Sequence, residues 1–150
     1  MTSAFPYTLH ATQGHARAGT LQTPHGAIET PIFMPVATHS TVRTLTWPQV
    51  NSTGAQIVLS NAYHMYLRPG HRLVEKAGGL HTWMNWSKPI LTDSGGFQVY
   101  SLAKHRKITD DGVKFKDPLS GESHFIGPKE SMEIQNALGA DIIMAFDECP

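Results

Sequence analysis

Four short apolar runs recur along the chain, at residues 31–36 (PIFMPV), 56–60 (QIVLS), 89–92 (PILT) and 141–146 (DIIMAF). Three of these runs are nearly continuous rather than alternating, which is typical of strands buried on both faces, as in a parallel sheet. β-Branched residues in the second and fourth runs favour strand over helix. The pattern therefore predicts four buried strands.

Helical patterns lie between these runs. Three stretches end at glycine in the manner of a helix stop: residues 46–54, 73–79 and 128–139. In the first of them, Thr46 is placed to cap a short helix that has Pro48 near its first turn. Because strands alternate with helices, the sequence predicts βα units and a parallel sheet.

Two segments depart from this alternation. Residues 7–30 are typical of an antiparallel hairpin, and residues 105–127 of a small antiparallel insertion with a turn at Asp111-Gly112. The predicted fold class is therefore α/β, a βα barrel or open sheet with two antiparallel decorations. Since four strands do not close an eight-stranded barrel, and the chain stops just after an apolar run, we expect it to be the opening part of a larger enzyme.

Composition narrows the classes of function. Lys+Arg and Asp+Glu both number 12, so the formal net charge is zero, and any nucleic-acid contact must lie on a local patch or outside this chain. With no signal-peptide pattern in residues 1–10 and no apolar stretch as long as a membrane span, we expect a cytoplasmic protein. The single cysteine, Cys149, and the absence of paired-histidine motifs predict no metal site in this chain.

The loops that follow the predicted strands all begin with polar residues. They start at residues 37–40 (ATHS), 61–64 (NAYH), 93–98 (DSGGFQ) and 147–149 (DEC). In a βα barrel, the loops at the carboxyl ends of the strands build the active site. Solvation alone would explain one such loop, but four together indicate a functional rim.

Asp93 is the strongest candidate, because it directly follows an apolar run and so lies at the rim of an apolar wall. Burial of that kind suits a carboxyl group to proton transfer. Ser94, Gly95 and Gly96 then remove side-chain bulk, so that backbone N–H groups can approach a flat or anionic ligand. Phe97 offers a ring for stacking a base. The competing interpretation is an Asp helix cap with a Gly-Gly turn.

Asp147 follows an apolar run in the same way. Two carboxylates on different strands suggest a divided task, in which one moves protons and the other binds a polar substrate edge. We predict that Asp93 and Asp147 face one cavity with Phe97 beside them. Cys149 has no adjacent base and is interpreted as pocket wall rather than nucleophile, and Ser94 lacks the elbow motif of serine hydrolases.

Several long motifs occur together and in order: residues 30–36 (TPIFMPV), 54–60 (GAQIVLS), 61–70 (NAYHMYLRPG), 84–102 (MNWSKPILTDSGGFQVYSL), 108–115 (ITDDGVKF) and 131–149 (SMEIQNALGADIIMAFDEC). From about residue 19 onward, the chain resembles the tRNA-guanine transglycosylases, the enzymes of queuosine insertion into tRNA, and their bacterial form most closely.

The resemblance implies the first part of an irregular (β/α)8 TIM barrel. An N-terminal antiparallel sheet would occupy about residues 1–30, and the first barrel strands and helices about residues 31–150, with an insertion at 105–127. The implied activity is that of a pentosyltransferase that exchanges guanine at the tRNA wobble position for a 7-deazaguanine, preQ1 or queuine, through a covalent ribosyl–enzyme intermediate. The implied partners are the tRNA anticodon loop, guanine, the deazaguanine base and a second copy in a homodimer, with no membrane.

By the same resemblance, Asp93 is the general acid/base, Asp147 hydrogen-bonds the amidine edge of the purine and Phe97 stacks on the base. The rest of the base-binding loop is Ser94, Gly95 and Gly96. A carboxylate that accepts two N–H bonds selects guanine-like over adenine-like bases. The nucleophile of the family, the ligands of its Zn²⁺ cofactor and its C-terminal zinc subdomain match no residues here, so this chain alone is expected to be inactive.

Two departures and two alternatives accompany this interpretation. Residues 37–40 read ATHS where the family has Gly-Thr and a further Gly, and Arg43 stands where it has Lys, on a loop near the family's dimer interface. The alternatives are an archaeosine-type transglycosylase, acting at a different tRNA position, and a non-catalytic partner subunit of the same fold. A metal-dependent barrel hydrolase is disfavoured, because no H-x-H pair follows the first predicted strand.

Overall fold

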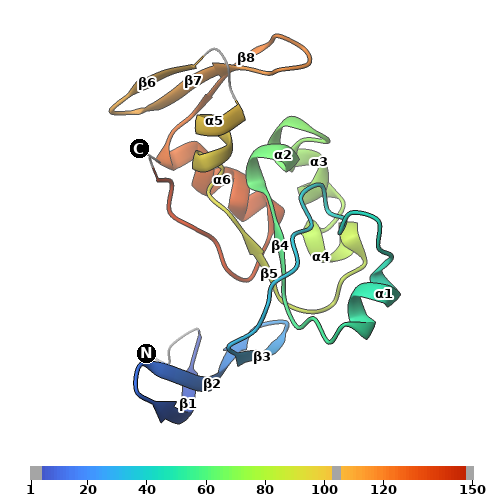
Figure 1. Ribbon diagram of the computed structural model, residues 1–150. Coiled ribbons are helices and arrows are strands. Elements are labelled where there is room, and N and C mark those ends of the chain that lie inside the picture. Colours follow the sequence, from blue (N-terminus) through green and yellow to red (C-terminus); the bar gives the residue numbers. More distant parts are fainter. Residues whose placement is uncertain (1–4, 103–105, 148–150) are drawn as a thin grey trace.

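The computed structural model describes residues 5–102 and 106–147, and these form an α/β arrangement with three small sheets (Figure 1). An antiparallel sheet lies near the N-terminus, a parallel pair of strands lies in the middle, and a second antiparallel sheet lies at the opposite end. The predicted fold class, α/β with antiparallel decorations, is confirmed. The described residues contain no closed barrel.

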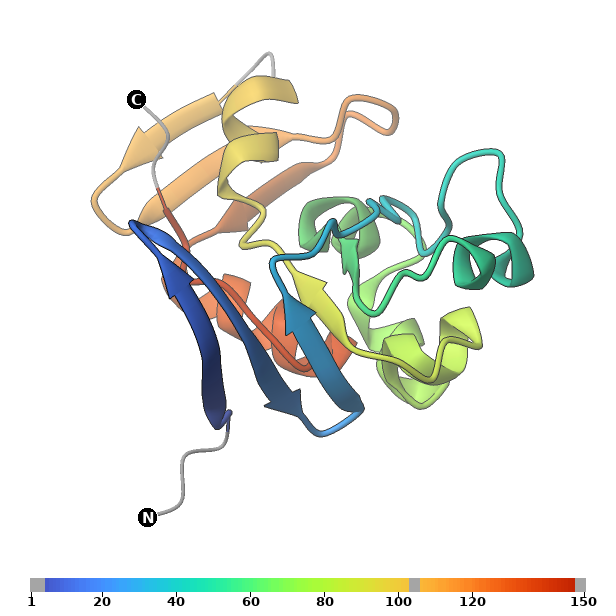
Figure 2. The same cartoon turned by 60° about the horizontal axis from the view of Figure 1, so that its bottom comes forward.

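The N-terminal sheet consists of β1 (Tyr7–Gln13), β2 (Ala16–Thr23) and β3 (Gly26–Thr30), which pair antiparallel in that order. Figure 2 shows the three strands side by side. Gly14 and Gly26 turn the chain with φ angles of +58° and +129°, which glycine adopts readily. The antiparallel pairing predicted for residues 7–30 is therefore present, and a third strand extends the hairpin.

The middle of the molecule is the parallel pair β4 (Val58–Ser60) and β5 (Ile90–Thr92). A parallel bridge joins Val36 to β4, and another joins Ile142 to β5. The four apolar runs therefore lie side by side in chain order. Their parallel course confirms the βα prediction for this part of the chain.

The two outer runs do not have the burial that the sequence predicted. Residues 31–36 and 141–146 each contribute a single bridge rather than a strand, and Val36 and Met144 are 50% and 46% exposed. The reason is their position, since each outer run has a neighbouring strand on one side only among the described residues. The prediction of burial on both faces holds for β4 and β5 and is wrong for the outer runs.

The helices are α1 (Trp47–Ser52), α2 (Ala62–Leu67), α3 (His71–Lys76), α4 (Gly79–Met84), α5 (Gly96–Leu102) and α6 (Pro128–Leu138). Thr46 caps α1 and Gly139 ends α6 in the left-handed conformation, both as predicted. Gly78 was predicted only to end a helix. It does follow the end of α3, and it is also the N-cap residue of α4.

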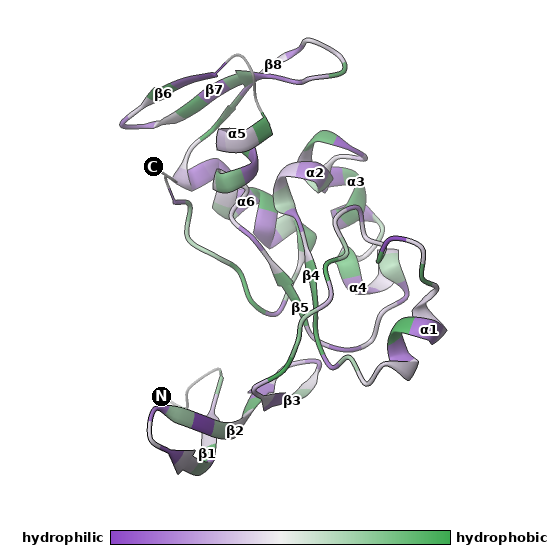
Figure 3. Cartoon of the chain, in the orientation of Figure 1, coloured by the Kyte–Doolittle hydropathy of each residue, from purple (hydrophilic) through white to green (hydrophobic). Residues whose placement is uncertain are grey.

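The second antiparallel sheet is formed by β6 (Arg106–Thr109), β7 (Gly112–Lys116) and β8 (Ser123–Ile126). It confirms the insertion predicted for residues 105–127, within the described residues. Val113, Phe115 and Ile126 on its inner face are buried in the same apolar cluster as β4 and β5. Figure 3 shows hydrophobic colour along β4 and β5, where this cluster is centred.

Candidate active site

The site forms where β4 and β5 end. Because the two strands are parallel, the residues that follow them, Asn61 and Asp93, emerge at the same edge of the pair. Asn61 is the N-cap residue of α2, and Asp93 begins the turn that leads into α5. Polar side chains from two different loops are thereby brought together.

The carboxylate of Asp93 is held by the start of α2. Its Oδ1 accepts a hydrogen bond of 2.7 Å from the backbone N–H of Ala62, and its Oδ2 accepts one from the side-chain amide of Asn61. A free N–H in the first turn of a helix is a natural donor to an anion. Asp93 is half-buried, so its carboxylate is fixed in place and remains within reach of a ligand.

Asp147 is joined to the turn after Asp93 through Ser94. The Ser94 hydroxyl donates to Asp147 Oδ1 over 2.7 Å and accepts a 3.1 Å bond from the Gly96 N–H. A Cβ atom at position 96 would lie 2.3 Å from the backbone O of Asp147 and 2.8 Å from its Oδ1. Glycine is therefore required at position 96 by the close approach of Asp147, for a steric rather than a conformational reason.

Helix α6 holds the turn and the segment that carries Asp147. The hydroxyl of Ser131 donates to the Ser94 carbonyl over 2.7 Å. The buried side-chain oxygen of Gln135 accepts from the Thr92 hydroxyl (3.0 Å) and the Met144 N–H (2.9 Å), and its amide nitrogen donates to the Met144 carbonyl (2.8 Å). The strand end and the outer run are thus fixed to one helix side chain.

A cavity of about 480 Å³ opens beside this arrangement. Gly96 and Asp147 line it together with residues of α5 and of the β6–β7 hairpin: Val99, Tyr100, Ile108, Thr109, Asp110, Gly112 and Val113. Pro128 and Phe146 complete its wall. The size suits a purine base with room for part of a sugar.

The predicted site residues occupy different positions around this cavity. Asp147 and Gly96 line it, Ser94 and Gly95 are buried behind it, and Asp93 bonds to the start of α2. Phe97 is 55% exposed, so its ring is open to a ligand. That Asp93 and Phe97 face the same cavity as Asp147 stays a prediction. Glu148 and Cys149 lie outside the described residues.

A histidine beside Asp93 shapes the electrostatics of the site. Burial lowers the pKa of His64, the neighbouring His39 lowers it further, and the negative charge of Asp93 opposes both effects. The rings of His39 and His64 lie 4.7 Å apart between centroids. At neutral pH, His64 is therefore uncharged and leaves the Asp93 carboxylate without a cationic partner on this side.

Sequence reasoning missed three polar residues of the site. Asn61 was noted only as one of the polar residues that follow the predicted strands, and Gln135 lies in the predicted helix of residues 128–139 with no role in the site assigned to it. Both nevertheless hold the site together. The side-chain oxygen of Gln98 is buried with no hydrogen-bond partner among the described residues, and Gln98 directly follows Phe97 in α5. The signal that could have identified Gln135 is a polar side chain at a helical position where the pattern calls for an apolar one, because a buried polar side chain needs hydrogen-bond partners.

The chain also brings together a group of side chains that could hold a metal ion: His25, His81 and Asp141. The sequence predicted no metal site, because the chain has one cysteine and no paired-histidine motif, and these three residues are far apart along the chain. Nδ1 of His25 and Nε2 of His81 lie 2.7 and 3.2 Å from the two carboxylate oxygens of Asp141, which also accepts the Ile90 N–H. The Asp141 carboxylate is thus held between three protein groups, and the group joins the N-terminal sheet, α4 and β5 at the end opposite Asp93.

The comparisons with known proteins cover nearly the whole chain. A family model described as queuine tRNA-ribosyltransferase matches residues 12–150. The chain belongs to this family. It is 60% identical to the queuine tRNA-ribosyltransferase of Halalkalibacterium halodurans, over 99% of this chain and 40% of that protein. It is 63% identical to the queuine tRNA-ribosyltransferase of Desulforamulus reducens, over 89% of this chain and 36% of that protein. It is 57% identical to that of Geobacillus kaustophilus, over 100% of this chain and 40% of that protein.

The chain therefore spans about two fifths of the length of these queuine tRNA-ribosyltransferases. The family resemblance inferred from the motifs is confirmed, including the likeness to the bacterial form. Among the described residues, no helix is long and apolar enough to cross a membrane.

Proposed function

We propose that the full-length protein containing this chain is a tRNA-guanine transglycosylase, which replaces guanine at the wobble position of tRNA with a 7-deazaguanine base. The observation that carries the proposal is the Ser94 bridge, which ties the Asp93 turn to the Asp147 carboxylate beside a base-sized cavity. The relatives are queuine tRNA-ribosyltransferases, which supports a tRNA substrate.

Asp147 is assigned to recognition of the base. Its Oδ1 already accepts the Ser94 hydroxyl, and the carboxylate retains lone pairs for the N1–H and the exocyclic amino group of guanine. Adenine presents an acceptor at N1 and would meet the carboxylate with repulsion. The Asp147 carboxylate therefore distinguishes the two purines.

Asp93 is assigned to proton transfer. In the exchange, a nucleophile bonds to C1′ of the ribose as the C1′–N9 bond breaks, and the leaving guanine takes the electron pair and a proton. The incoming base then loses its N9 proton and attacks C1′, which releases the nucleophile. Bonds from Asn61 and from Ala62 N–H keep the Asp93 carboxylate in one position for these proton transfers.

The remaining roles belong to the base platform. The exposed ring of Phe97 is assigned to stacking, and the unpartnered oxygen of Gln98 to accepting a bond from a polar edge of the base. Gly95 and Gly96 let the turn approach the base without side-chain bulk. Each assignment uses a group that the described residues leave available.

The same proposal extends to the molecule beyond this chain. We infer an irregular (β/α)8 barrel, which the parallel order of the four apolar runs supports. The nucleophile and the ligands of a zinc ion are assigned to residues outside this chain, because its one cysteine, Cys149, cannot form a Cys cluster. A homodimer and a cytoplasmic location belong to the proposal as well.

Incorporation of radiolabelled guanine into unmodified tRNA by the full-length protein tests this function. The expected result is exchange at the wobble guanosine that unlabelled 7-deazaguanine inhibits and unlabelled adenine does not. Exchange at a guanosine elsewhere in the tRNA would favour the archaeosine-type activity. Binding of tRNA without any exchange would favour the non-catalytic partner subunit.

A further inference from the structure

The second antiparallel sheet carries a local excess of positive charge. Its three strands contain four cationic residues and no acidic one, in the sequences RKIT, GVKFK and SHFI. The whole chain has a formal net charge of zero, so this sheet differs from the average of the chain. The acidic residues of the insertion lie in its turns, at Asp110, Asp111, Asp117 and Glu122.

Three of the cations share one face. Lys107 on β6 pairs directly with Lys114 on β7, and Lys116 follows two positions further along β7, so the three side chains point to the same side. Phe125 pairs with Lys114 from the other side and is 41% exposed on this face. We call these four residues the lysine face.

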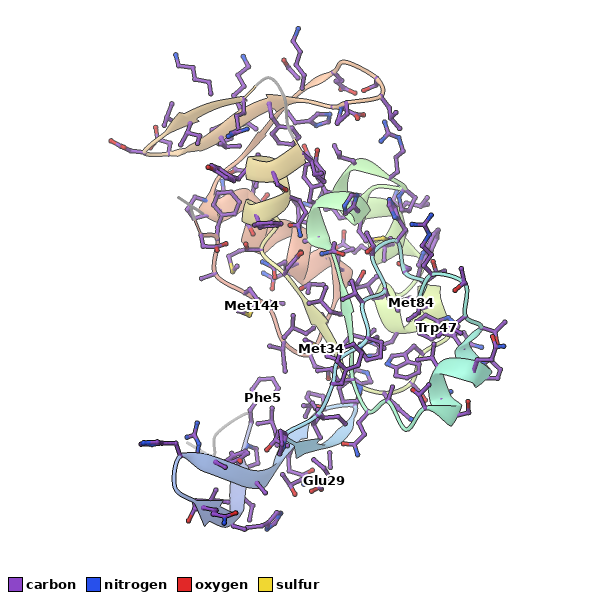
Figure 4. The ribbon with its side chains drawn as sticks, in the orientation of Figure 1. Phe5, Glu29, Met34, Trp47, Met84 and Met144 are labelled. Carbon is purple, nitrogen blue, oxygen red and sulfur yellow. The ribbon has the colours of Figure 1, made fainter. Side chains whose placement is uncertain are left out.

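The sheet turns this face away from the molecule. Val113 and Phe115, which alternate with the lysines on β7, are buried on the inner side. Figure 4 shows long side chains ending in nitrogen that rise from the side of the sheet facing away from α5. An open depression of about 340 Å³ lies at Lys107, Lys114 and Lys116, with Arg106, Phe115 and Ser123 around it.

The fold itself gives the lysine face no counter-charge. Within the described residues, none of Lys107, Lys114 and Lys116 has a carboxylate within 4.0 Å, whereas Lys129 on α6 lies 3.9 Å from Glu133. Like charges directly opposite each other on a sheet are destabilising. Lysine on an edge strand can prevent aggregation, but Lys114 and Lys116 are on the central strand, where that purpose does not apply.

We propose that the lysine face binds the phosphate backbone of the RNA whose base enters the cavity at Asp147. This inference rests on the proposed function. Ile108, Thr109 and Gly112 of the same sheet line the cavity, and the lysine face lies on the other side of that sheet. A strand of RNA with one base in the cavity therefore brings its flanking phosphates to the lysines by passing over the edge of the sheet. Phe125 among the lysines adds a ring on which an unpaired base can stack, a combination typical of single-stranded RNA sites.

The test compares two variants of the full-length protein. Lys107→Ala/Lys114→Ala/Lys116→Ala removes the lysine face, and Lys76→Ala/Lys129→Ala removes exposed lysines on α3 and α6 as the matched control. Kd for cognate tRNA is measured by filter binding between about 50 and 200 mM salt, and exchange is followed with labelled guanine. A third variant, with arginine at all three positions of the lysine face, keeps the charge.

The triple alanine variant is expected to bind tRNA at least about tenfold more weakly, with the slope of log K against log salt smaller by about 2, because roughly three phosphate contacts are lost. The KM for tRNA rises while kcat at saturating tRNA is retained, and the control and arginine variants resemble the wild type. An unchanged Kd and salt slope in the alanine variant, with normal exchange by the wild type, would overturn this inference and leave the proposed function standing. Absence of exchange by the wild type would overturn the proposed function instead.

Discussion

Gly96 is a position of the candidate site at which the structure leaves no room for a side chain. Alanine there would place its Cβ against backbone and carboxylate atoms of Asp147, and neither can move without breaking the Ser94 bridge. The segment that carries Asp147 is also bonded through Met144 to Gln135. A methyl group at position 96 is therefore expected to displace the Asp147 carboxylate, because the surrounding atoms leave no space for it.

We expect Gly96→Ala to lower kcat/KM for guanine exchange by about 100-fold or more, since errors of about an ångström in a site have effects of that size. Ser101→Ala, an exposed change on the same helix, serves as the control and should be nearly silent. Steady-state exchange kinetics of the full-length variants give the answer. A Gly96→Ala enzyme of normal activity would show that Asp147 does not need its observed position.

Asp147 itself is tested by an isosteric change. An amide at this position can accept one of the two guanine N–H groups and points its own donors at the other. Asp147→Asn is expected to lose about 10- to 100-fold in preference for guanine, the cost of one unpaired buried polar group. Asp110→Asn, which alters another carboxylate of the same cavity, is the control. Competition between guanine and adenine measures the preference, and an unchanged ratio would remove Asp147 from base recognition.

At the scale of elements, α6 organises the site through a residue that faces the apolar cluster. Replacing Gln135 by alanine leaves the Thr92 hydroxyl and both backbone groups of Met144 without partners and opens a cavity. We expect a loss of about 2–4 kcal/mol in the free energy of unfolding. Gln22→Ala, an exposed change on β2, should cost little. Denaturant unfolding of the full-length variants provides the comparison, and a stable Gln135→Ala protein would show that the outer run is held by other contacts.

Asp117 in the β7–β8 loop contributes to the stability of the fold, and this contribution changes with pH. A bond from the Leu119 N–H, together with bonds from Ser120 and Arg68, lowers the pKa of Asp117 from 3.8 to about 2. A depressed carboxyl pKa stabilises the fold above the unfolded value, and that stabilisation is lost as the pH falls through the folded value.

Wild type should therefore be more stable than Asp117→Asn at pH 5, and the difference should shrink between pH 3.8 and about 2. Thermal unfolding of the two proteins across this range measures the difference. Asp111→Asn, in the turn between β6 and β7, is the matched control. A difference between wild type and Asp117→Asn that stays constant down to pH 2 would contradict the assigned role of these hydrogen bonds.

Much of the fold could be predicted from local signals. The parallel order of the four apolar runs, the cap of α1, the stop of α6 and the pairing of residues 105–127 all follow from short-range patterns. Helices α2, α4 and α5 were not predicted from the sequence. Gly78 and Gly96, at the starts of α4 and α5, have the local pattern of turns. The exposure of Met144 depends on which neighbours its run has, and that is not encoded locally.

The candidate site also contains some residues that local signals reveal and others that they do not. Asp93, Ser94, Gly96 and Asp147 could be chosen as candidates from the sequence, because polar residues that follow buried parallel strands emerge at one edge of the sheet. The lysine face could be anticipated only as an unspecified local patch, since the charges of the insertion cancel in sequence. Strand register separates them, by placing the lysines on one face and the acids in the turns.

For the whole molecule, we propose that the described residues supply recognition and proton transfer and that the nucleophile lies elsewhere in the protein. The central claim of this proposal is that Asp93, fixed by Asn61 and Ala62, moves the protons of base exchange. An Asn at position 93 keeps the size of the side chain and an oxygen for the Ala62 N–H, but it cannot take up or release a proton at neutral pH. Asp93→Asn should therefore lower the rate of base exchange and leave the affinity for tRNA nearly unchanged.

The most direct measurement is labelled guanine exchange by full-length Asp93→Asn under single-turnover conditions, with the Kd for tRNA determined on the same preparation. We predict that exchange falls by about 10³-fold or more, while tRNA binding, which depends on phosphate contacts, stays within about twofold of the wild type. Exchange at a near-normal rate by Asp93→Asn, with Asp111→Asn as the reference variant, would contradict the account.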